Sequence, residues 1–191
     1  MKYYLLIPIL AIFILAGCAK ENSILEPQTS QIQTNRQWLK INQSSTLSVE
    51  NTYTVTKSID GNKGGSIALV QSFINDGKQA SFSANLTIPK HAFKGTLNIS
   101  YTVNTETASI EFSPTTPGFN RDLSLDLIFT GIDISKNKTS DLRFSYLDGD
   151  NIIPVESAYV KVDVNQGILE VLGAQISHFS RYGWSTLDDQ E

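Results

Sequence analysis

The sequence predicts an all-β fold, an antiparallel β-sandwich that follows a signal peptide and a flexible polar tether. Three observations support this prediction. Apolar and polar residues alternate with a period of two, most clearly at residues 81–88, 97–103 and 123–129. Such alternation is typical of strands with one face in a core and the other in water. Turn sequences separate the alternating segments, and no segment keeps a helical period over three turns.

Residues 1–17 have the organisation of a lipoprotein signal peptide. A short basic start is followed by an apolar run at residues 5–14 and by the tetrapeptide Leu-Ala-Gly-Cys, which ends at Cys18. The run is shorter than the ~20 residues that a transmembrane helix needs, so it is left out of the fold. The tetrapeptide resembles the bacterial lipobox, in which the cysteine thiol takes a diacylglyceryl group and the chain is cut before it. This resemblance implies lipidation at Cys18. The alternative is an ordinary signal peptide with an incidental cysteine.

Residues 18–49 are expected to form a lipid-anchored polar tether. Their composition is rich in Gln, Asn, Ser and Thr, as at residues 28–35. Such a segment buries too little apolar surface to offset the entropy lost on ordering. Trp38 and Leu39 interrupt the polar composition and are candidates for docking on the domain or on a partner. The sandwich is expected at residues 50–185, with an acidic tail at residues 186–191.

The sandwich domain is expected to contain further short strands between turn sequences. The expected strands are residues 53–59, 66–73, 110–112, 142–146, 159–164 and 168–172. The turns are Asp60-Gly61-Asn62, Asn75-Asp76-Gly77, Pro117-Gly118, Asp148-Gly149-Asp150-Asn151 and Asn165-Gln166-Gly167. Many short antiparallel strands at this spacing are typical of a sandwich or barrel.

Six stretches of the domain come in a particular order along the chain. They are GGSIAL (64–69), ANLTIPKHAF (84–93), TLNISYTV (96–103), IEFSPTTPGFNRDLSLDLIF (110–129), DLRFSYLDGDNIIPVES (141–157) and ISHFSRYGW (176–184). This order resembles the bacterial relatives of the ZU-type β-sandwich of zonula occludens proteins, netrin receptors and ankyrins. The resemblance implies a binding or scaffold module without catalysis. His91 stands where the family's proline turn has a glycine, so we expect a different turn geometry there. Residues 67–73 and the turn after them form an insertion.

Charge and cysteine content exclude several classes of function. The formal net charge is −4 and the charges are scattered, so the chain has no basic footprint for nucleic acid or for anionic lipid. Cys18 is the only cysteine, which excludes an intramolecular disulfide and a second thiol for catalysis. Membrane attachment would therefore come from several acyl chains at Cys18, because one chain alone binds marginally.

Candidate metal and ligand sites are few. Asp148, Asp150 and Asn151 form the best acidic cluster, but their spacing does not fit an EF-hand and a hairpin turn explains them. We expect no metal and no cofactor. Exposed aromatic side chains on sandwich loops could bind glycans, and each candidate is also a candidate core residue. These candidates are Tyr146, Tyr159, Trp184 and Phe119.

The tripeptide His178-Phe179-Ser180 resembles the self-cleaving motif of nucleoporin and death-domain scaffold families. The resemblance implies Ser180 as nucleophile, His178 as base and Phe179 as the new carboxyl end. On a regular strand, residues two apart lie roughly 6.5 Å from each other, too far for a firm hydrogen bond. Cleavage would therefore need a bulged or strained backbone. The sequence hints at one, because Ile176 and Phe179 are both apolar but would lie on opposite faces of a regular strand. We predict a structural role, with Phe179 and Tyr182 anchoring a closing strand.

The sequence thus predicts a lipid-anchored protein of the bacterial cell envelope, at the outer membrane or cell surface if the cell is Gram-negative. Its partners would be the membrane, through Cys18, and an extracytoplasmic protein or glycan, with no nucleic acid. The alternatives are a self-processing domain cut between Phe179 and Ser180, and a carbohydrate- or peptide-binding accessory lipoprotein.

Overall fold

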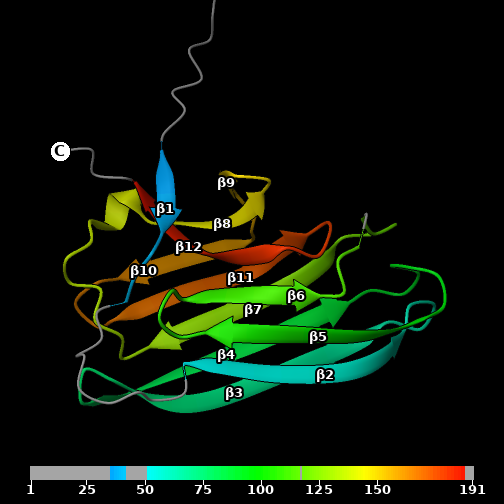
Figure 1. Ribbon diagram of the computed structural model, residues 1–191, viewed down its shortest axis with the longest axis horizontal. Coiled ribbons are helices and arrows are strands. Elements are labelled where there is room, and N and C mark those ends of the chain that lie inside the picture. The colour runs from blue at the N-terminus through cyan, green and yellow to red at the C-terminus, as the bar shows by residue number, and fades with distance from the viewer. Residues whose placement is uncertain (1–34, 42–50, 117, 188–191) are drawn as a thin grey trace, which may run out of the picture. The chain divides into compact units, whose positions relative to one another are not determined.

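The computed structural model describes residues 35–41, 51–116 and 118–187 and confirms the all-β prediction (Figure 1). Two antiparallel sheets pack against each other. Within these residues the only helical element is a single 3₁₀ turn, η1 (Thr139–Asp141). The predicted signal peptide, residues 1–17, and the predicted lipidation site, Cys18, lie outside the described residues.

The first sheet gathers strands from both ends of the described chain. Its order is β2 (Thr52–Asp60), β5 (Thr96–Asn104), β6 (Ser109–Ser113), β12 (Arg181–Leu187), β8 (Arg143–Asp148) and β9 (Asn151–Pro154). A further strand, β1 (Arg36–Trp38), pairs with the end of β12. All of the pairings in this sheet are antiparallel.

The second sheet has the order β10 (Tyr159–Asp163), β11 (Ile168–Ile176), β7 (Leu123–Thr130), β4 (Lys78–Ile88) and β3 (Gly65–Asn75). A two-residue turn, Asp76-Gly77, joins β3 to β4. Both turn residues have positive φ, 49° and 74°, as the hairpin turn that follows the right-handed strand twist requires. The turn sequence therefore fixes the register of this hairpin.

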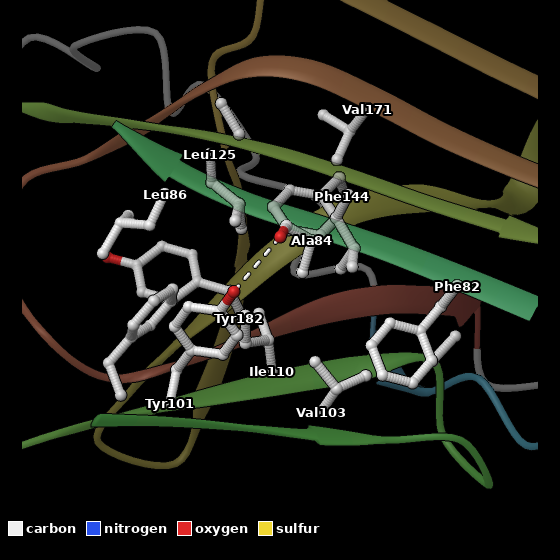
Figure 2. Close-up of a cluster of buried hydrophobic side chains, with 14 of the residues drawn as sticks. Phe82, Ala84, Leu86, Tyr101, Val103, Ile110, Leu125, Phe144, Val171 and Tyr182 are labelled. Atoms are coloured by element: carbon white, nitrogen blue, oxygen red, sulfur yellow. Dashed lines mark hydrogen bonds between the residues drawn. The ribbon is translucent and has the colours of Figure 1, made fainter. Parts of the chain in front are cut away.

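The core lies between the sheets and consists of the inward side chains of the alternating strands (Figure 2). Leu125 and Phe82 from the second sheet face Val103 and Ile110 from the first, and all four are buried. Tyr101 lies among them, and its hydroxyl group donates to the backbone oxygen of Ala84 (3.1 Å). Burial raises the pKa of Tyr101, so the phenol stays protonated.

The expected boundary of the domain at residue 50 differs from the structure. Residues 36–38 form β1, and the side chains of Leu39 and Ile41 are 0% and 4% exposed. The Leu39 amide donates to the Trp184 oxygen (2.8 Å), and the Ile41 amide donates to the Glu106 oxygen (2.7 Å). Residues 36–41 of the predicted tether thus belong to the sandwich, and the docking expected of Leu39 takes place on the domain itself.

Three more expectations about strands need correction. The strand β9 was not expected, because its four residues follow directly on the acidic turn. The strand β11 continues beyond residue 172 to Ile176, through an irregularity between Val171 and Ala174 where Gly173 has a φ of 65°. The closing strand β12 begins only at Arg181 and runs to Leu187, so it extends into the predicted tail.

The turn at His91 has the left-handed conformation that glycine adopts most readily. His91 has a φ of 64° and its amide donates to the Gly61 oxygen (2.8 Å). A histidine in this region of φ and ψ carries a cost that glycine does not. The backbone here is therefore one that suits a glycine, although the residue is a histidine.

Candidate functional site

The His-Phe-Ser tripeptide lies in the bend between β11 and β12, and not in a regular strand. Phe179 is 2% exposed; its ring stacks on Phe112 at 5.3 Å and meets Phe119 edge-on at 4.9 Å. The Phe179 amide donates to the Thr116 hydroxyl group (3.2 Å). The predicted role of Phe179 as a core anchor is confirmed, but the anchor belongs to a bend.

The polar groups of His178 and Ser180 point to different partners. The Ser180 hydroxyl group donates to the Leu147 backbone oxygen (2.7 Å), and its own backbone oxygen accepts from the Phe112 amide (3.2 Å). The Nδ1 atom of His178 is hydrogen-bonded to the Ser177 hydroxyl group (3.1 Å). Among the described residues, no hydrogen bond joins His178 to Ser180. A carbonyl oxygen is not a base that could take the Ser180 proton, so this arrangement does not activate the hydroxyl group.

Beside the bend is a small hollow of about 220 Å³, which we call the tyrosine pocket. Tyr146 on β8 and Tyr182 on β12 are directly opposite in the strand pairing, and their rings stack at 5.7 Å. The His178 ring meets Tyr146 edge-on at 5.3 Å. The residues that line the pocket are Asp122, Tyr146, Ile153, Pro154, Val155, Glu156, Gln175, Ser177 and Tyr182.

The tyrosine pocket contains a neutral hydrogen-bond donor, the Tyr182 hydroxyl group, and two acidic side chains, Asp122 and Glu156. Burial raises the pKa of Tyr182, and the neighbouring Tyr146 and Asp122 raise it further. The hydrogen bond from Tyr182 to the His178 backbone oxygen (2.8 Å) acts in the opposite direction. Tyr182 therefore remains protonated and fixes the bend. The carboxylates of Asp122 and Glu156 are exposed, and among the described residues that line the pocket there is no lysine or arginine.

The donor and acceptor set of the tyrosine pocket suits a small polar ligand. Carboxylates, the Gln175 amide and the Ser177 hydroxyl group can bind hydroxyl groups, while the Tyr146 ring offers an apolar face. The volume is below the ~300–1,000 Å³ of typical ligand sites. A single sugar ring is closer to this size than a larger cofactor.

The structure places one of the four predicted aromatic candidates in this pocket, namely Tyr146. Trp184 is 0% exposed and packs edge-on against Phe144, with ring centroids 5.9 Å apart, so of its two expected roles the core role is confirmed and a binding platform there is excluded. Phe119 is half-buried against Phe179. Tyr159 is 48% exposed at the edge strand β10.

Asp122, Glu156 and Gln175 also line the pocket, and the sequence did not predict a binding role for them or for Tyr182. Tyr182 was predicted only as an anchor. The two carboxylates come from connections far apart in the chain, before β7 and after β9. No local spacing pattern joins them, so the sequence alone carries no signal for their meeting.

A second hollow, of about 370 Å³, lies at the turns that follow β3, β7 and β10. Its lining includes Asp76, Lys78, Ile132 and Gln166, and no aromatic side chain of the described part of the chain. Gly167 is needed there, because a Cβ atom would lie 2.1 Å from the Ile132 oxygen. The glycines of this hollow are thus explained by chain packing, and the tyrosine pocket remains the better candidate for a ligand.

The acidic turn after β8 is a hairpin, as expected, with Asp148 paired opposite Asn151. In the part of the chain that the structure describes, no three His, Cys, Asp or Glu side chains cluster as metal ligands would. The same residues contain no helix long and apolar enough to cross a bilayer. Comparison of the chain with models of protein families, with curated proteins and with solved structures finds no match.

Proposed function

We propose that the chain is a lipid-anchored protein of the bacterial cell envelope whose β-sandwich is a non-catalytic binding or scaffold module of ZU-type-like architecture. The packing and hydrogen bonding of the His-Phe-Ser tripeptide are the observation that supports a non-catalytic module. The Phe179 ring is buried, the Ser180 hydroxyl group donates to the Leu147 backbone oxygen, and the His178 backbone oxygen accepts from the Tyr182 hydroxyl group. Each group has a packing or hydrogen-bonding role, which supports a structural tripeptide over the self-processing alternative.

The anchor in this proposal is the acylated Cys18. Its support is the order of basic start, apolar run and Leu-Ala-Gly-Cys in the sequence. Residues 18–34 would connect the lipid to the sandwich, a shorter connection than the sequence suggested, because residues 36–41 belong to the domain. A cysteine that carries several acyl chains is sufficient for stable membrane attachment, whereas a single chain binds only marginally.

Cys18→Ser is expected to release the protein from membranes. The serine hydroxyl group cannot form the thioether, so processing stops and the acyl chains are absent. Partitioning of the expressed full chain between detergent and aqueous phases measures this, with Ser23→Ala as a matched control that keeps the cysteine. A Cys18→Ser variant that is processed normally and still enters the detergent phase would contradict the proposal.

A carbohydrate ligand is the second candidate, because the tyrosine pocket combines an aromatic ring with two exposed carboxylates. Sugar rings stack on tyrosine faces and their hydroxyl groups bind carboxylates and amides. The ligand would lie between β8 and the connection after β9.

Tyr146→Ala is expected to abolish glycan binding, while Tyr159→Ala, at an exposed tyrosine outside the pocket, leaves it unchanged. A glycan array probed with the chain, followed by titration of the best ligand, tests this. Circular dichroism of both variants shows that they are folded. An array without any bound glycan, or equal loss in both variants, would remove the carbohydrate candidate.

A further inference from the structure

The strand β3 is an exposed edge of the second sheet and lacks the features that usually protect an edge (Figure 1). It has 11 residues, GSIALVQSFIN, with no charge and no proline. Natural edge strands are kept from pairing with other chains by charges, prolines or short length. β3 has none of these.

The other sheet edges carry such protection. The strand β10, at the opposite edge of the same sheet, has five residues that include Lys161 and Asp163. In the first sheet, β9 has four residues and ends at Pro154, and β2 carries Lys57 and Asp60. The contrast singles out β3.

The backbone groups that β3 presents outward follow from its turn. Asn75 and Lys78 close the two-residue hairpin, so they form a hydrogen-bonded pair and the odd-numbered residues of β3 bond to β4. The even-numbered residues then direct their N–H and C=O groups to the open edge. The Ser66 oxygen supports this phase, because it accepts from the Lys57 ammonium group of β2 (2.9 Å). Among the described residues, nothing pairs with the outward backbone groups of residues 68, 70, 72 and 74.

The side chains at this edge are apolar and exposed. Val70 is 65% exposed and Ile74 is 51% exposed, the highest fractions among the exposed large apolar side chains of the described residues. Ala68, Val70 and Ile74 lie on the solvent-facing side of the sheet, because they alternate with the buried Ile67 and Phe73. An apolar edge with free backbone groups binds another strand by extending the sheet.

We propose that β3 pairs with β3 of a second copy of this chain, antiparallel and about a two-fold axis at Gln71. In this register Val70 is opposite Ser72 of the second copy, and Ala68 is opposite Ile74. The four outward residues then pair only with one another, and each such pair exchanges two backbone hydrogen bonds. Gln71 faces Gln71 of the second copy, and two amides can hydrogen-bond to each other.

Charge complementarity favours a second copy as the occupant. In the same register Ser66 is opposite Asp76 of the second copy, because Asp76 is at the tip of the hairpin. The Lys57 ammonium group lies on the Ser66 oxygen, so it comes beside that carboxylate. The two-fold axis makes this pair of opposite charges twice, while the uncharged centre of β3 meets an identical uncharged strand. A closed two-fold contact also covers both exposed edges at once.

Disulfide cross-linking of the full chain tests the proposal. Gln71→Cys is introduced together with Cys18→Ser, so that the new thiol is the only one. Residues opposite each other in a non-hydrogen-bonded pair have Cβ atoms about 4.5–5.5 Å apart, within reach of a disulfide after small adjustment. We expect a disulfide-linked dimer of the chain on non-reducing gels after mild oxidation in cells. Val160→Cys in the same background, at the protected edge β10, is the control and is expected to remain monomeric.

Two further variants make the outcome specific. Val70→Lys adds a charge to the exposed edge and is expected to eliminate the Gln71→Cys dimer, with an unchanged circular dichroism spectrum. Lys57→Asp is expected to lower the yield of the dimer, and Lys57→Asp with Asp76→Lys is expected to restore it. No dimer from Gln71→Cys, an equal yield from Val160→Cys, or a disulfide to a different protein would overturn the proposal.

Discussion

Leu125→Asp is expected to unfold the sandwich. Leu125 is 0% exposed and is the third residue of β7, which lies between β4 and β11 in the second sheet. Its backbone neighbours in the pairing are Leu86 and Ala174, which are also 0% exposed. A carboxylate there would lie among buried apolar side chains, and burying an unpaired charge costs several kcal/mol even after relaxation. That cost is comparable with the whole stability of a domain, about 5–15 kcal/mol.

Ser124→Asp is the matched control for Leu125→Asp. Ser124 is the preceding residue of the same strand and its side chain is on the half-buried outer face. Far-ultraviolet circular dichroism with thermal unfolding should show a strand spectrum and a cooperative transition for the control, and neither for Leu125→Asp. A folded, cooperatively unfolding Leu125→Asp protein would show that β7 does not face the core.

Leu39→Ala is expected to lower the free energy of unfolding by about 2–5 kcal/mol, as for other buried leucines. Leu39 is 0% exposed and follows β1, so truncation leaves a cavity in the core. Lys40→Ala is the control, since Lys40 is exposed and surface substitutions usually change stability by less than about 0.5 kcal/mol. Equilibrium denaturation by urea measures both.

Equal stability of Leu39→Ala and Lys40→Ala would mean that residues 36–41 are not part of the folded domain. The same reasoning applies to truncation. A chain that begins at residue 49 lacks β1, Leu39 and Ile41, so it should be markedly less stable than one that begins at residue 35. The tether predicted from composition would then be too long by these residues.

The sequence predicted the sandwich and the bodies of its longer strands, because the period of two depends only on neighbouring residues. It failed at β1, whose three residues lie in a polar context. Its partner is far along the chain, since Arg36 bonds to Ser185 across 149 residues. Local composition cannot reveal a pairing of that range. The sequence also indicated an irregular backbone between Ile176 and Phe179, which would lie on opposite faces of a regular strand. In the structure a bend separates them, and both side chains are buried.

The candidate site was less predictable than the fold. Tyr146 was a candidate from its residue type alone, whereas the pocket depends on the strand register that places Tyr182 opposite it. Asp122 and Glu156 reach the pocket from separate connections. For Trp184 the sequence left a core role and a binding role open, because the residue type alone does not say which face of a strand the ring occupies. These positions follow from the sheet order, which the sequence does not state.

The intact mass of the protein purified from cells tests the central claim, an acylated and non-catalytic module, most directly. The expected mass is that of a chain from an acylated Cys18 to Glu191, with Ser180→Ala giving only the mass change of the substitution. The bound Ser180 hydroxyl group and the separate partner of His178 are the structural reasons. A chain without residues 180–191, restored to full length by Ser180→Ala, would contradict the account and establish self-cleavage.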